Sequence, residues 1–170
     1  MSEPFSSHNT TSLFTVSITS TDDKSKSVTA QYNPKEVGIN KSVPWQKHKD
    51  SKSDQPQLEF SGADGRSLDL ELTFDGYEDK INVHDEYVNK LIEMTMAQVD
   101  ASDKKGKEDQ KRPHMIVLTW GAGSKLPKFE GVIESVNTKY TMFLNDGTPV
   151  RATCTVKLKE ASKASFKKKA

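Results

Sequence analysis

Residues 68–74 read Leu-Asp-Leu-Glu-Leu-Thr-Phe, in which apolar and polar side chains alternate at every position. Successive side chains of a β-strand point to opposite faces of the sheet, so the three leucines and Phe74 share one face. This stretch therefore predicts a strand with one buried and one wet face, and it indicates a chain built mainly from β-structure.

The same alternation continues along the chain on both sides of this stretch. Four more segments repeat it: Phe14 to Ile18, Leu58 to Phe60, Ile116 to Trp120 and Val150 to Leu158. A longer run from Val136 to Leu144 is followed by Asn145, Asp146 and Gly147, residue types that tolerate a positive φ angle. We therefore expect an extensive sheet, whose last two strands form an antiparallel hairpin.

One segment has helical rather than strand periodicity. Asn82 with Asp85 resembles a capping box, and apolar side chains recur at helical spacing from His84 onwards. We expect one helix from Asn82 to about Gln98, with its apolar side on the sheet. The predicted class is mainly β (α+β), an antiparallel β-barrel or sandwich with one packed helix.

Length and composition limit the organisation of the chain. Its 170 residues suit one domain, which we place at residues 12–160, between flexible ends at 1–11 and 161–170. Polar stretches at 46–54 and 100–112 are expected to be loops. The N-terminus lacks the pattern of a signal peptide, so we expect synthesis in the cytoplasm and no insertion into a membrane.

Charge and cysteine content exclude several classes of function. The 25 basic and 24 acidic residues leave a net charge of +1, which argues against nucleic-acid binding. Four scattered histidines and one cysteine offer no metal-ligand spacing, so no metal or cofactor is expected. Cys154 lies on the apolar side of its predicted strand and is interpreted as part of the core.

Two further chemistries remain open as alternatives. Acidic side chains at Asp69, Glu71 and Asp75 leave a hydrolase carried as cargo as one alternative. Trp45 and Trp120 leave a carbohydrate-binding module as another. The expectation is nevertheless that the protein is not an enzyme and works by contact with other proteins.

A series of short motifs in one order narrows the choice. They are Tyr32-Asn33-Pro34-Lys35-Glu36, Lys41-Ser42-Val43-Pro44-Trp45, Leu58-Glu59-Phe60-Ser61-Gly62, Leu68 to Asp75 with Tyr77, Arg112-Pro113, Trp120-Gly121, Phe129-Glu130-Gly131-Val132, Tyr140-Thr141-Met142-Phe143 and Asp146 to Ala152. Together they resemble the tube-type N-terminal domain of contractile injection systems, from about Phe14 to Glu160. Fuller members of that family continue into a LysM module, for which this chain has no room.

The resemblance implies a tail-tube fold and a role in assembly without turnover. It implies a structural adaptor in the baseplate of a phage-tail-like particle, forming a hexameric ring that joins the spike hub to the inner tube. The implied partners are further copies of this chain, the spike or hub protein, the inner tube protein and other baseplate proteins. The alternative within this class is the bulk protomer of the inner tube.

Six residues are candidates for assembly contacts. Trp45 and the Asn33-Pro34 turn are predicted to lie on an extended arm that clasps a neighbouring copy, although Trp45 covering its own core is an equal alternative. Arg151 and the loop tip from Asn145 to Pro149 are candidates for facing an adjacent ring, although an ordinary hairpin tip is the favoured alternative. The full set is Asn33, Pro34, Trp45, Asp146, Gly147 and Arg151.

Overall fold

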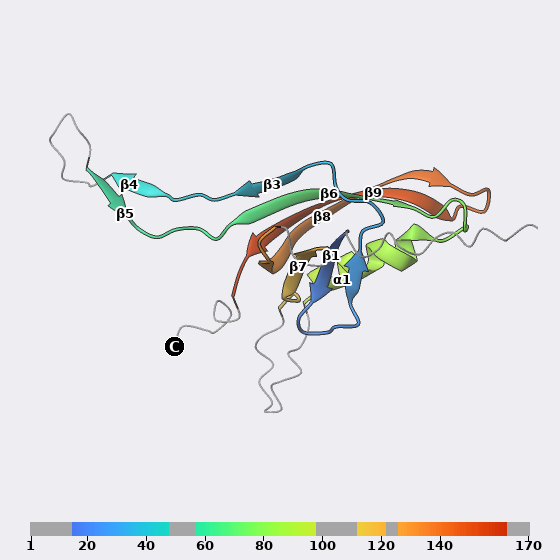
Figure 1. Cartoon of the computed structure of the whole chain (residues 1–170), viewed down its shortest axis with the longest axis horizontal. Coiled ribbons are helices and arrows are strands. Elements are labelled where there is room, and N and C mark those ends of the chain that lie inside the picture. Colours follow the sequence, from blue (N-terminus) through green and yellow to red (C-terminus); the bar gives the residue numbers. More distant parts are fainter. Residues whose placement is uncertain (1–14, 48–56, 98–111, 122–125, 163–170) are drawn as a thin grey trace, which may run out of the picture.

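The computed structural model describes residues 15–47, 57–97, 112–121 and 126–162 (Figure 1). Its elements in chain order are β1 (Val16–Ser20), β2 (Ser27–Thr29), β3 (Val37–Asn40), β4 (Trp45–Lys47), β5 (Leu58–Phe60), β6 (Ser67–Asp75), the π-helix η2 (His84–Val88), α1 (Asn89–Thr95), β7 (Ile116–Trp120), β8 (Phe129–Phe143) and β9 (Pro149–Glu160). The predicted termini and the loop at 100–112 lie almost entirely outside these residues.

A single antiparallel sheet of seven strands forms the body of the molecule, in the order β2-β1-β7-β8-β9-β6-β3. The stretch quoted first is the centre of β6, where Leu72 lies opposite Cys154 of β9. The prediction of a mainly β protein with one helix is confirmed. The sheet is open, because β2 and β3 each have only one neighbouring strand among the described residues.

The core lies between one face of this sheet and the helical segment η2–α1 (Figure 1). The apolar side chains of β6 and β9 are buried there, together with Val88, Leu91 and Met94 of the helix. Phe74 of β6 stacks on Tyr87 of η2, with ring centroids 4.5 Å apart. One amphipathic helix therefore covers the centre of a sheet much longer than itself.

The helix differs from its prediction at both ends. The side-chain oxygen of Asn82 accepts the N–H of His84 at 3.0 Å, and its amide donates to Asp85 at 2.8 Å, so Asn82 closes a local turn just before the helix. The first helical turns are π-helical, and α1 ends at Thr95 because Met96 is extended. The helix is therefore shorter than the range to Gln98 that was predicted.

The β8–β9 hairpin is confirmed, with its turn at the predicted residues. Gly147 has φ +88°, a conformation that favours glycine. The N–H of Leu144 donates to the carbonyl of Thr148 at 2.9 Å, and the carboxylate of Asp146 accepts the N–H of Thr148 at 2.9 Å. These bonds fix the register of the two longest strands, of 15 and 12 residues.

Beyond β3, the chain runs out into a separate two-stranded hairpin of β4 and β5, which projects from the end of the main sheet (Figure 1). We call residues 41–47 and 57–64 the arm. The prediction that Leu58 and Phe60 form a buried face is wrong, since both are 57% exposed. The helix covers the main sheet but not the arm, so the alternating pattern forms a strand there without a core.

None of the helices among the described residues is long and apolar enough to cross a membrane.

Candidate assembly surface

The side chains considered for catalysis are buried or already paired. Cys154 is fully buried on β9, 3.4 Å from the hydroxyl of Thr138, and burial raises the pKa of its thiol. A raised pKa leaves less of the reactive thiolate at neutral pH. Cys154 is therefore placed as a core residue, as its position in the sequence pattern predicted.

The acidic side chains that left a hydrolase open lie on the polar face of β6. Asp75 accepts two hydrogen bonds from Arg151, at 2.9 and 2.5 Å. The backbone N–H of Tyr77, and then Arg151, lower the pKa of Asp75, whereas a general acid needs a raised pKa. Asp69 is opposite Lys157 in the strand register. Asp75 is therefore committed to an ion pair, and Glu71 is exposed opposite Thr155.

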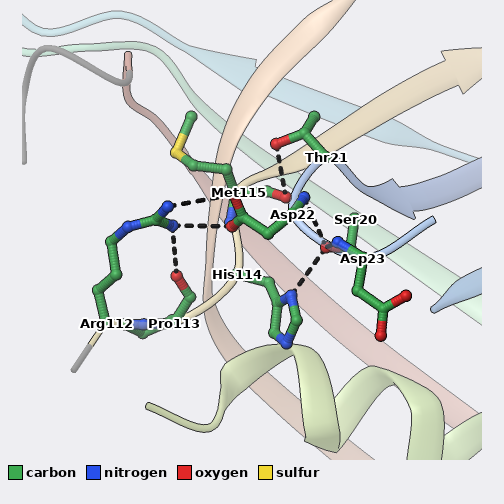
Figure 2. Close-up of polar contacts among 8 residues, drawn as sticks. All are labelled: Ser20, Thr21, Asp22, Asp23, Arg112, Pro113, His114 and Met115. Atoms are coloured by element: carbon green, nitrogen blue, oxygen red, sulfur yellow. Dashed lines mark hydrogen bonds and ion pairs between the residues drawn. The ribbon is translucent and has the colours of Figure 1, made fainter. Parts of the chain in front are cut away.

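The structure brings together a serine and a histidine that the sequence did not single out. The hydroxyl of Ser20 lies 2.8 Å from Nδ1 of His114, and both residues are buried (Figure 2). The two residues are 94 positions apart in the sequence, so no local motif could have predicted their contact. Their side chains are 1% and 2% exposed, which leaves no access for a substrate.

Metal and ring-stacking sites were also considered from the sequence. Within the described ranges, no three His, Cys, Asp or Glu side chains lie close enough to hold a metal ion. His84 instead contacts the hydroxyl of Tyr140 at 2.6 Å, while His8 and His48 lie outside the described residues. Trp120 packs against the core of the main sheet, and Trp45 is on the arm, so the two indoles form no common platform.

The arm exposes two large aromatic side chains, Trp45 and Phe60. In the β4–β5 register, Trp45 pairs with Phe60, and Lys47 pairs with Leu58. The rings of Trp45 and Phe60 are 5.7 Å apart and tilted by 57°. Trp45 is 56% exposed and is not part of the core cluster, so it does not cover its own core.

Further exposed apolar side chains lead from the main sheet to this hairpin. Ile39 on β3 is directly opposite the buried Leu68 yet is itself 49% exposed, and Val43 follows at the start of the arm. We call this set the arm patch: Ile39, Val43, Trp45, Leu58 and Phe60. An exposed apolar patch of this kind marks an interaction surface in a folded protein.

The base of the arm is held by charged and backbone hydrogen bonds. The backbone N–H, Nε and Nη2 of Arg66 donate to Glu160 at 2.8, 3.0 and 2.6 Å, and Glu160 donates its N–H to the carbonyl of Arg66 at 2.7 Å. The hydrogen bonds from the side chain and backbone of Arg66 lower the pKa of Glu160 to about 2. Lys41 also donates to the carbonyl of Asp64 at 2.6 Å. The arm therefore leaves the sheet from a braced position.

The other candidate contacts lie at the opposite end of the main sheet. Gln31 exchanges two hydrogen bonds with the backbone of Asp75, at 3.0 and 2.6 Å, which holds the following turn beside the end of β6. Asn33 and Pro34 are in this turn, between β2 and β3, at the opposite end of β3 from Trp45. We call this end, together with the β8–β9 turn, the hairpin end.

The remaining three predicted residues belong to the hairpin end. Asp146 and Gly147 are exposed in the β8–β9 turn, and Arg151 follows at the start of β9. Arg151 is committed to its ion pair with Asp75, with 41% of its side chain still exposed. Of the six candidates, Trp45 alone is therefore on the arm. The exposure of Leu58, Phe60 and Ile39 was not predictable from the alternating pattern.

Comparison with known proteins gives one finding. A search of curated proteins finds no match to this chain. A family model described as "contractile injection system tube protein" matches residues 12–169, which is nearly the whole chain. The mainly β fold with one helix is consistent with the expectation drawn from the motifs. The chain belongs to the contractile injection system tube protein family.

Proposed function

We propose that this protein is a structural adaptor in the baseplate of a contractile injection system, forming a hexameric ring that joins the spike hub to the inner tube. The observation that carries the proposal is the arm patch, because four large apolar side chains stand in solvent on a braced projection and Ile39 is exposed beside its base. Burial against a neighbour contributes about 25 cal/mol for each Å² of apolar surface removed from water. The proposed role is assembly, without catalytic turnover.

The edges of the main sheet support a contact between copies. Each of β2 and β3 has one neighbouring strand among the described residues, so each presents backbone groups on its outer side. Open edges readily pair with further strands, and a heterologous contact between such edges closes into a ring when its rotation divides a full circle. The proposed ring uses both edges of every copy.

The two ends of the sheet support contacts with different partners. The arm leaves one end, and the hairpin end carries the other five candidates, Asn33, Pro34, Asp146, Gly147 and Arg151, beside the exposed Phe143. The arm patch is apolar, whereas the hairpin end combines charged side chains with an exposed aromatic ring, so the two ends require different surfaces from a partner. In the proposed arrangement one end faces the spike hub and the other the inner tube, with further baseplate proteins outside.

The arm patch is tested by a double substitution, Trp45→Ala with Phe60→Ala. These two side chains form one cross-strand pair on the exposed hairpin, so their loss removes apolar contact area with little effect on the core. We expect the free energy of unfolding of the protomer to change by less than about 0.5 kcal/mol. We expect incorporation into purified particles, measured by quantitative mass spectrometry, to fall at least about tenfold.

The matched control is Gln46→Ala with Glu59→Ala, the cross-strand pair at the next position of the same hairpin. Side chains at alternate strand positions point to opposite faces, so this control leaves the apolar pair intact. Normal incorporation of the control and loss of the Trp45/Phe60 variant would support the proposal. Normal incorporation of both variants into particles would contradict the proposal.

The bulk tube protomer is the second candidate, favoured by the family description as a tube protein. The two roles differ in copy number, because a terminal ring is present once in a particle and a tube is a long stack of rings. Counting copies against the sheath protein in purified particles separates them. About six copies per particle fits the adaptor, and a number that grows with particle length fits the tube protomer.

A further inference from the structure

The contacts around His114 connect three elements. Residues 112–115, which we call the strap, lie between α1 and the turn at residues 20–23 that leaves β1 (Figure 2). The N–H of His114 donates to the carbonyl of Met94 on α1 at 3.1 Å. Thr21 donates its N–H to the carbonyl of Met115 at 2.8 Å. The strap therefore joins the end of the helix to the turn that follows β1.

Hydrogen-bond counting fixes the protonation state of the imidazole. The hydroxyl oxygen of Ser20 accepts the backbone N–H groups of Asp22 and Asp23, at 3.2 and 3.0 Å. Both of its lone pairs are then occupied, so its own proton points to Nδ1 of His114, 2.8 Å away. Nδ1 is the acceptor, and the ring proton is on Nε2. His114 is neutral in this arrangement.

The same counting shows what a second ring proton would do. A proton on Nδ1 would point at an oxygen whose two lone pairs are already used, so one N–H bond of the turn would have to break. Nε2 is buried and has no hydrogen-bond partner among the described residues. A cationic His114, 2% exposed, would thus hold two donors without acceptors.

The charged groups that face this site are already committed to other donors. The carboxylate of Asp22 accepts Arg112 at 2.8 and 3.1 Å and the N–H of Met115 at 2.8 Å. The carboxylate of Asp23 accepts the N–H and hydroxyl of Ser25. On the helix side, Glu93 is paired with Lys26 of the turn before β2. None of these carboxylates bonds to the ring of His114.

We propose that Ser20 and His114 form a pH-sensitive switch that holds the strap to the β1–β2 turn while His114 is neutral. Protonation of His114 breaks one of the two bonds of Ser20 to the turn and so weakens the attachment of the strap, whose remaining bonds run through Thr21 and Asp22. The stabilisation is therefore present while the ring is neutral and is lost when it gains a second proton. This inference stands on the protomer alone and does not rest on the proposed function.

Amide hydrogen exchange of the purified full-length protein, followed by NMR, tests the switch. At about pH 7.5 the amides of Asp22, Asp23 and Met115 are expected to be protected. At about pH 5.5 their protection factors, which correct for the intrinsic effect of pH on exchange, are expected to fall at least about tenfold. Core amides such as that of Leu72 serve as the internal reference and are expected to keep their protection.

Two substitutions separate His114 from other titrating groups. His114→Gln keeps a side chain that accepts from Ser20 and cannot gain a charge, so the pH-dependent fall should disappear. His84→Gln removes the other described histidine, which contacts Tyr140, and should leave the fall unchanged. A fall of equal size in His114→Gln, or none in the wild type, would overturn the switch.

A second measurement keeps the switch testable if His114→Gln does not fold. The ring protons of His114 in the wild-type protein report its protonation directly by chemical shift. The switch requires that these shifts and the protection of Asp22, Asp23 and Met115 change over the same pH range. A ring that gains its proton while all three amides stay protected would overturn it, as would amides that open while the ring stays neutral.

Discussion

At Gly131 on β8, the sheet leaves no room for any side chain. A Cβ atom added here would lie 2.0 Å from the carbonyl oxygen of Lys159 on the neighbouring strand, far inside van der Waals contact. Since the obstacle is backbone, β8 and β9 would have to separate at this point. We expect Gly131→Ala to lower the free energy of unfolding by about 3 kcal/mol, measured by urea denaturation.

Gly38 supplies the control for this substitution. A Cβ at Gly38 would meet the Cβ of Asp69 at 3.8 Å, an ordinary contact. Gly38→Ala, which also lies within a strand, should change stability by no more than about 0.5 kcal/mol. Equal losses in the two variants would show that loss of glycine, rather than the contact with Lys159, is responsible.

The ion pair of Arg66 and Glu160 gives stability a dependence on acid pH. The pKa of Glu160 is lowered from 4.5 to about 2 in the folded protein. Its contribution is therefore complete above about pH 4.5 and is lost as pH falls towards 2. We expect Glu160→Gln to remove part of the acid-induced loss of stability in this range, measured by denaturant unfolding at successive pH values.

Both partners of this pair are about one-third exposed, so solvent screening reduces its contribution. Glu130→Gln is the control, because Glu130 pairs with Lys128 in a more exposed position. The wild type and Glu130→Gln should lose stability in parallel between pH 4.5 and 2. An identical loss in Glu160→Gln would mean that Glu160 does not contribute.

Individual side chains were predictable where neighbours in the sequence decide their surroundings. Cys154 was placed correctly in the core, because its strand alternates regularly and half of it is buried. Ser20 and His114 were not found, since their contact depends on the path of the chain through the sheet. Whether a side chain is buried depends on which distant parts of the chain pack against it. Phe60 was therefore wrongly predicted to be buried, because no other element covers the arm among the described residues.

Among the elements, the short helix α1 is expected to contribute stability out of proportion to its length. Leu91 is fully buried against the sheet, and α1 with η2 forms the helical cover of the core in the described structure. Leu91→Ala would leave a cavity that the surrounding sheet cannot fill. We expect a loss of about 2 to 5 kcal/mol in the free energy of unfolding, measured by urea denaturation.

Lys90, the preceding residue, is the control for this prediction. Its side chain is on the outer side of the helix and pairs with Glu86 at 3.1 Å. An ion pair of this spacing contributes about 0.3 to 0.5 kcal/mol, so Lys90→Ala should have a small effect. A small effect of Leu91→Ala as well would mean that the helix is not required to cover the sheet.

The strands were more predictable than the relations between them. Alternation identified β1, β5, β6, β7, β9 and much of β8, and the turn residues identified the β8–β9 hairpin. No local signal predicted that β6 pairs with β9 or that β1 pairs with β7. The alternation of apolar and polar residues shows which face of a strand is buried, but not which strand lies next to it. The same limit applies to the arm: the alternation at Leu58 and Phe60 correctly predicted a strand, but wrongly predicted that these side chains are buried.

At the scale of the whole molecule, the order of strands makes folding slow. Ile18 pairs with Leu118, about 100 residues away, and Leu72 pairs with Cys154. Loops of this length must close before these contacts form, and sheets with such pairings fold in milliseconds to seconds. We expect a refolding time in this range, measured by stopped-flow fluorescence of a Trp45→Phe variant that leaves Trp120 as the reporter.

Refolding in microseconds would contradict this expectation. The β8–β9 hairpin provides an internal comparison, because its partners are joined by a short turn. Amides at the turn end of the hairpin, near Tyr140 and Ala152, should gain protection no later than those of β1 in a pulsed hydrogen-exchange experiment. Protection of β1 before this hairpin would show that long-range pairing does not limit the rate.

The length of β8 and β9 also determines how the molecule bears a mechanical load. The 12 residues of β9 span about 40 Å, from the turn at Pro149 to the brace at Glu160, and β9 is bonded to β8 on one side and β6 on the other. A pull along these strands loads the hydrogen bonds of both ladders in shear, so many bonds resist together. A pull across them breaks the bonds one after another. The protomer is therefore stiff along the line from the arm to the hairpin end, and far weaker at right angles to it.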